Sequence, residues 1–129
     1  MISIDTNVVV RFLVGDDVDQ FRRAERVIRE NEVFVPLTVV LEAEWVLRDR
    51  CDKPRRAVVQ ALCDFAALPS VVLEDAPRVA RALDWAGAGM DLADALHRAG
   101  SAEGAAFVSF DRKLAKIARR VGAPKVLDP

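Results

Sequence analysis

The chain has 129 residues, of which 52% are hydrophobic and 30% charged, and its formal net charge is −1. This length suits one domain with its own core, and the near-neutral charge excludes a broadly basic nucleic-acid-binding surface. No apolar run approaches the ~20 residues that span a bilayer. No signal peptide is visible, Cys51 and Cys63 form no CxxC pair, and the single histidine leaves no zinc site. We therefore expect one domain, residues 1–129, in the reducing cytoplasm.

The first thirteen residues combine a strand, a polar turn and a helix. Ile2 and Ile4 predict a short buried strand that ends at Asp5, and an apolar run after Asn7 predicts a helix over residues 7–14. Open α/β sheets bind ligands at the carboxyl ends of their strands, which is where Asp5 falls. Asp5 or Asn7 could equally serve as a cap of the following helix, so both interpretations stay open.

The rest of the chain alternates helical and strand patterns with short connections. Further helices are predicted over residues 18–30, 39–50, 55–68, 75 to 87 or 89, 91–103 and 112–121, and further strands over residues 32–35, 70–73, 106–110 and 125–127. Thr38 is the expected cap of the 39–50 helix. Short strands that alternate with helices favour a single α/β/α sandwich with a short, mainly parallel sheet.

Acidic residues occur where these elements meet. Asp5 and Asp111 each follow an apolar strand, and Glu42 lies in the first turns of the helix after the second strand. Asp91 and Asp94 open a further helix and lie near one of its faces. If the sheet is parallel, carboxylates from four separate segments can therefore meet at one edge.

Such a cluster repels itself unless a cation enters it. Mg²⁺ and Mn²⁺ prefer oxygen ligands, and Asn7 and Ser109 would add further oxygen atoms. Ions held in this way activate water and neutralise charge on a phosphodiester. The pattern therefore indicates a metal-dependent nuclease.

Two acids on the 39–50 helix compete for the site. Glu42 and Glu44 lie about 200° apart around a helix, so only one can face the cleft. We favour Glu42, because Trp45 and Val46 would then pack beside it. Trp45 and Trp85 lie in apolar helical patterns and are expected in the core or an interface rather than as base-stacking platforms.

Structural roles remain open for the other acids. Asp94 could pair with Arg98 one turn later, and Asp111 could cap the last helix. A basic run near the C-terminus contains no acid and is interpreted as a solvated helix face or an RNA-backbone guide. This run consists of Arg112, Lys113, Lys116, Arg119, Arg120 and Lys125.

Four motifs resemble those of one family: IDTN at residues 4–7, EAEWVL at 42–47, DLADALH at 91–97 and VSFDRKL at 108–114. Through them the chain resembles PIN-domain ribonucleases, and closely the VapC toxins of bacterial toxin–antitoxin pairs. The resemblance implies a PIN-domain fold, supporting roles for Asn7 and Ser109, and an unsettled role for Asp91. The implied catalytic and metal-binding residues are Asp5, Glu42, Asp94 and Asp111.

The implied activity is that of an endoribonuclease that uses Mg²⁺, with Mn²⁺ as an alternative ion. Its RNA cleavage would inhibit translation and growth until a VapB-like antitoxin binds, and a homodimer is expected. Arg112, Lys113 and Lys116 are the candidates for contact with the RNA backbone. The first two helices would offer the antitoxin a groove, because they carry more apolar residues than one thin sheet face needs. These residues are Val9, Phe12, Leu13 and Phe21.

Other functions remain as alternatives. Asp5 could be the covalent nucleophile of a phosphatase or phosphoacceptor domain, or the chain could be a PIN-like interaction module without activity. A hydrolytic triad of Asp94, His97 and Ser101 is disfavoured, because one helix provides neither a nucleophile elbow nor an oxyanion hole.

Overall fold

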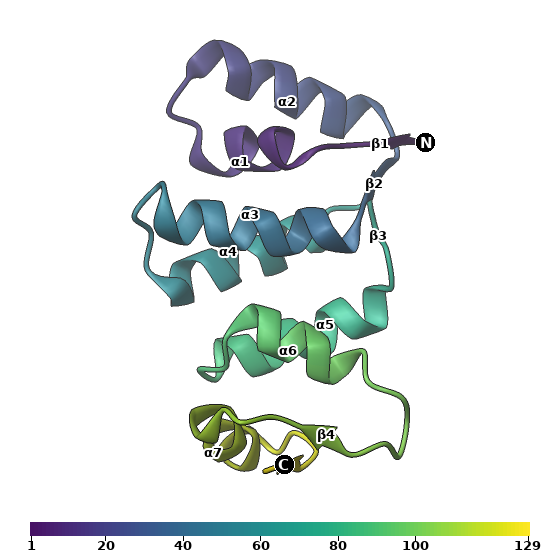
Figure 1. Ribbon diagram of the computed structural model, residues 1–129. Helices are drawn as coiled ribbons and strands as arrows, with labels where there is room; N and C mark the ends of the chain where they lie inside the picture. Colours follow the sequence, from purple (N-terminus) through teal and green to yellow (C-terminus); the bar gives the residue numbers. More distant parts are fainter. The chain divides into compact units, whose positions relative to one another are not determined.

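The computed structural model describes all residues, 1–129, and the chain forms two compact units, Met1–Ala76 and Pro77–Pro129 (Figure 1). Every strand pairing is parallel, and helices connect successive strands. The strands are hydrogen-bonded in one sheet of three and one of two. The α/β fold with short parallel sheets is therefore confirmed. None of the helices is both long enough and apolar enough to cross a membrane.

The first unit contains the three-stranded sheet, in the order β1-β2-β3. Its elements are β1 (Ile2–Ser3), α1 (Thr6–Val14), α2 (Val18–Glu30), β2 (Val33–Val35), α3 (Leu37–Asp49), α4 (Arg55–Ala66) and β3 (Val71–Leu73). The central strand β2 provides the buried residues Val33 and Val35, as expected for a strand that pairs on both sides.

A helical hairpin, α1–α2, follows the first strand. Gly15 ends α1 in the left-handed region at a φ of 67°, a conformation that glycine adopts without steric cost. The hairpin is held by Phe12, whose ring stacks on Phe21 at 5.8 Å between centroids and lies 6.0 Å from Phe65 of α4. Aromatic pairs at these distances stabilise packing beyond the area that they bury. The apolar surplus of α1 and α2 is thus largely used inside the unit.

The second unit contains α5 (Ala76–Gly87), which begins at the last residue of the first unit, α6 (Leu92–Ala99), β4 (Phe107–Val108), α7 (Arg112–Val121) and β5 (Val126–Leu127). Its core consists of apolar residues at helical spacing on α5, α6 and α7. Arg78 of α5 donates Nε to the Leu96 carbonyl of α6 at 2.9 Å, and Arg120 of α7 donates to the Ala88 carbonyl at 3.2 Å.

Some boundary predictions were wrong. The β1 strand is exposed rather than buried, with Ile2 at 40%, because it is an edge strand of its sheet. Thr38 does not cap α3, which starts earlier; Pro36 is its N-cap residue, and the Leu37 N–H donates to Glu74 Oε1 at 3.0 Å. The 91–103 helix ends at Ala99, where Gly100 is the C-cap residue.

Candidate active site

Asp5 lies between β1 and α1 and is the N-cap residue of α1. Its Oδ1 accepts a hydrogen bond from the Thr6 N–H at 2.7 Å, and its carbonyl accepts from Val8 at 3.1 Å. The side chain is exposed. A carboxylate at this position is stabilised by the positive end of the helix dipole. The strand-end position of Asp5 and its capping role therefore occur together.

Asp111 has the same role in the second unit, as the N-cap residue of α7. Its Oδ1 accepts from the Leu114 N–H at 3.0 Å, and its own N–H donates to Ser109 Oγ at 3.0 Å. The Ser109 N–H in turn donates to the carbonyl of Leu127, the last residue of β5. Ser109 thus links the end of the two-stranded sheet to the start of α7, and its supporting role at a metal site stays a prediction.

Asp91 and Asp94 lie together at the start of α6. Asp91 is the N-cap residue, and its Oδ2 accepts from the Asp94 N–H at 3.3 Å. Both side chains are half-buried. Their proximity at one helix start, predicted from the three-residue spacing, is confirmed.

The two glutamates of α3 face different environments. Glu44 is 2% exposed, and its Oε1 accepts from Arg48 Nε at 2.8 Å, whereas Glu42 is exposed to solvent. The buried ion pair gives Glu44 a structural role, and Glu42 remains accessible to a ligand. Trp45 is 43% exposed beneath the Arg50 guanidinium, so of the two positions expected for it, core or interface, the core is excluded and the interface stays a prediction.

Asp5 and Glu42 belong to the first unit, and Asp94 and Asp111 to the second. Within neither unit do three or more His, Cys, Asp or Glu side chains gather into a group that could hold a metal ion. All four acids offer carboxylate oxygens, which is the donor chemistry that Mg²⁺ and Mn²⁺ prefer. Their convergence on one ion remains a prediction.

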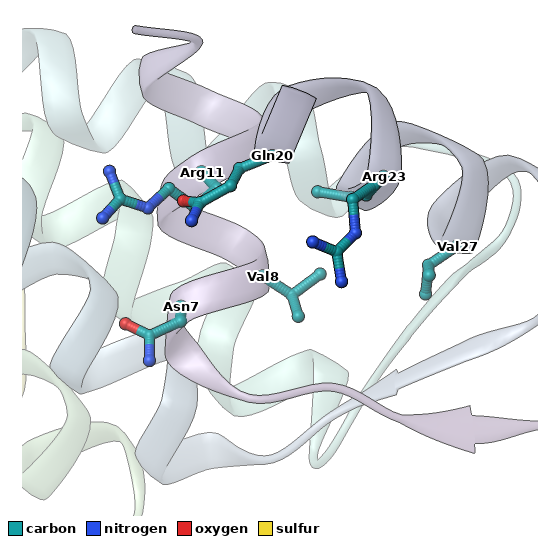
Figure 2. Close-up of a pocket in the computed structure, with 7 residues that line it drawn as sticks. Asn7, Val8, Arg11, Gln20, Arg23 and Val27 are labelled. Atoms are coloured by element: carbon teal, nitrogen blue, oxygen red, sulfur yellow. The ribbon is translucent and has the colours of Figure 1, made fainter. Parts of the chain in front are cut away.

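A groove lies along the α1–α2 hairpin, with a volume of about 410 Å³ (Figure 2). Figure 2 shows Val8 of α1 and Arg23 of α2 facing each other across it. Its lining residues are Asn7, Val8, Arg11, Gln20, Arg23, Ala24 and Val27. The lining thus combines two arginines, two amides and a short apolar stripe, and contains no acid.

The two groove arginines are held only loosely. Arg11 pairs with Asp16 at 3.6 Å and Arg23 with Asp19 at 3.7 Å, and all four side chains are at least 45% exposed. Exposed pairs of this kind contribute little to stability, about 0–1 kcal/mol each. Both guanidinium groups can therefore exchange their partners for a ligand at small cost.

The apolar residues from which a groove was predicted on α1 and α2 do not line it. Val9 is buried, and Phe12 and Phe21 stack on each other, so these side chains build the hairpin rather than line its groove. Sequence analysis missed Arg11, Gln20 and Arg23. The signal that was available is a spacing of four residues, from Asn7 to Arg11, from Gln20 to Ala24 and from Arg23 to Val27, but the pairing of the two helices decides which face is hollow.

The basic residues of α7 face solvent, as predicted. Arg112, Lys113 and Lys116 are exposed. A second, open groove of about 710 Å³ is lined by Lys113, Lys116, Ile117, Arg119 and Arg120. Such a cationic strip suits contact with a phosphate backbone.

The chain is thus an α/β protein in which acidic side chains lie where short parallel strands end and helices begin. The PIN-domain family model matches residues 2–120, and the chain belongs to the PIN domain family. PIN domains are generally nucleases, which supports a hydrolase acting on nucleic acid, and they typically use divalent metal ions. No curated protein and no solved structure matches the chain.

Proposed function

We propose that this protein is a Mg²⁺- or Mn²⁺-dependent endoribonuclease and the toxin of a VapBC-like type II toxin–antitoxin system. Its cleavage of RNA would inhibit translation and growth until the antitoxin binds. The observation that carries the proposal is the family match over residues 2–120, in which the four motif acids are all present. The accessible position of Glu42 and the helix-start positions of the other acids support it further.

In this mechanism, Asp5, Glu42, Asp94 and Asp111 would hold one or two divalent ions, which would supply charge neutralisation at the phosphodiester and lower the pKa of the attacking water. A carboxylate of the same set would take the proton from that water. Within the second unit, the hydrogen bond from the Asp111 N–H to Ser109 orients the start of α7.

The substrate-binding part of the proposal rests on the exposed cations of α7. Arg112, Lys113 and Lys116 each carry a positive charge into solvent on a helix without acids. Because RNA affinity depends on released counterions, these contacts would fall off with rising salt. They would position the RNA backbone rather than select its sequence.

The antitoxin part rests on the α1–α2 groove. Arg11 and Arg23 suit carboxylates, and Asn7 and Gln20 can bond to backbone amides. Val8, Ala24 and Val27 offer an apolar stripe for the other face of a helix. The occupant that fits is therefore an amphipathic antitoxin helix with acidic residues. Homodimerisation is proposed from the family resemblance alone.

The cleavage assay uses purified protein without antitoxin and labelled structured RNA. We expect cleavage with Mg²⁺ or Mn²⁺, none with chelator, and none with Asp5→Asn in either case. Sequencing the products identifies the target. Cleavage that persists in chelator, or that Asp5→Asn retains, would rule out the metal mechanism. A trapped phosphoaspartate at Asp5 would instead favour the phosphoacceptor alternative.

The antitoxin assay uses co-expression with the adjacent gene. Arg23→Glu should weaken co-purification of the small partner strongly, because it places an acid in the groove. Arg22→Glu is the matched control, because it makes the same charge change on the preceding residue of α2, which does not line the groove. Equal loss in both variants, or no partner with the wild type, would contradict the proposed docking site.

A further inference from the structure

The second unit contains a pocket of about 650 Å³ that no part of the proposed cleavage mechanism uses. Arg81 and Trp85 of α5 form one wall, Arg98 and Ser101 lie at the end of α6, and Lys125 precedes β5. The residues just before β4 and β5 complete it. Because these strands are parallel, the pocket lies at their amino ends, whereas Asp111 follows the carboxyl end of β4. Within the second unit it is therefore a separate site from Asp111.

Arg98 is the feature that points to a ligand. It is only 6% exposed; its Nε donates a hydrogen bond to the Pro124 carbonyl at 3.2 Å, and its guanidinium lies 5.5 Å from the centre of the Phe107 ring. Neither of these partners is an anion. A buried cation without an anionic partner is costly. A bound anion would compensate that cost.

The rest of the lining adds positive charge. Arg81 and Lys125 are exposed at the pocket, and its single acid is Glu103 on the exposed segment after α6. Three cations against one acid favour an anion over a neutral ligand. Guanidinium groups match the geometry of phosphate oxygens particularly well.

Trp85 indicates that the anion carries an aromatic base. Its half-buried indole lies in the pocket wall beside these cations. Bases stack on indole faces with little dependence on sequence. The volume lies within the range typical of small-molecule sites, roughly 300–1,000 Å³.

We propose that this pocket binds a nucleotide, with its phosphate on Arg98, Arg81 and Lys125 and its base against Trp85. The nucleotide comes either from the cell's free pool or from an RNA strand. The proposal does not depend on catalysis, and its test is run in chelator, so loss of the proposed cleavage activity would leave it intact.

The test measures tryptophan fluorescence of the full chain. A Trp45→Phe background leaves Trp85 as the only tryptophan. We expect saturable quenching by adenosine monophosphate, with adenosine and inorganic phosphate each binding about tenfold more weakly, because each lacks one of the two contacts. A short single-stranded RNA that competes with the nucleotide identifies RNA as the source. Binding of the free nucleotide without such competition identifies the free pool.

Two variants and a matched control test the residues. Arg81→Gln and Lys125→Gln change exposed side chains, so both should fold and should weaken nucleotide binding roughly three- to tenfold. Arg56→Gln removes the same charge from an exposed position of α4, which lines neither this pocket nor the cationic groove of α7, and should leave binding unchanged. Absence of quenching in the folded protein, or equal weakening by Arg56→Gln, would overturn the proposal. So would full binding by a folded Arg98→Gln variant, which would reduce Arg98 to a structural link.

Discussion

Asp111 offers the sharpest separation of a structural role from a catalytic one. Asn at this position keeps the acceptor for the Leu114 N–H and removes only the charge, whereas Ala removes both. Asn and Asp are similarly good N-caps, and replacing a cap with Ala costs about 1 kcal/mol. Loss of the charge at the helix start adds roughly 0.3–1 kcal/mol to either change. Asp111→Asn should thus be destabilised by at most about 1 kcal/mol and Asp111→Ala by about 1.5–2 kcal/mol.

For a chain of this size, the extra cost of Ala corresponds to a further fall of roughly 3–5 °C in Tm. Thermal unfolding followed by circular dichroism in chelator measures this difference, and RNA cleavage with Mg²⁺ measures the second role. Both variants should lose cleavage, although Asp111→Asn folds nearly as well as the wild type. If Asp111→Asn still cleaves, Asp111 is only a cap. If the two variants have the same Tm, the hydrogen bond to Leu114 contributes nothing to stability and the cap argument is wrong.

Three further predictions follow the same logic. Glu44→Gln should lower the free energy of unfolding by about 1–2 kcal/mol and retain cleavage, because it breaks a buried ion pair with a partly exposed arginine. Glu42→Gln should instead lose cleavage and retain its stability. Urea unfolding and the cleavage assay measure both outcomes. Asp94→Asn should abolish cleavage and Asp91→Asn only weaken it, since Asn preserves the cap of α6; equal losses would mean that the two are ranked wrongly. Excess Mg²⁺ should raise the Tm of the wild type through binding to the folded state and raise that of Asp5→Asn much less; a wild type indifferent to Mg²⁺ would contradict the metal site.

Helices with strong amphipathic patterns and clear caps could be predicted closely. The bounds of α2 and α7 match the prediction, because Asp17 and Asp111 cap them and Gly122 ends α7 in the left-handed region. The strands were predicted too long. β4 has only two residues, Phe107 and Val108, and Phe110 beyond it is 83% exposed, which an apolar pattern cannot reveal.

The positions of site residues could be predicted where a local sequence signal such as a helix cap sets them. They could not be predicted where packing between distant elements sets them. An aspartate just before an apolar helical run is a recognisable cap, which is why Asp5 and Asp111 could be placed. The start of α3 depends on Glu74, which is 37 residues away from Leu37 in sequence, so no local signal marks it. The grooves and the Arg98 pocket likewise arise from tertiary contacts between elements.

Helix capping and ion binding both require that the carboxylates of Asp5 and Asp111 are held in a fixed position. A cap holds one carboxylate oxygen against a backbone N–H, as Asp5 does with Thr6 and Asp111 with Leu114. The helix dipole then stabilises the negative charge in the absence of any cation. The cap thereby fixes the carboxylate in position, which is what a ligand for a hard cation needs. Stability in chelator consequently reports on the cap, and the response to Mg²⁺ reports on the ligand, so a single variant can separate two roles that one side chain combines.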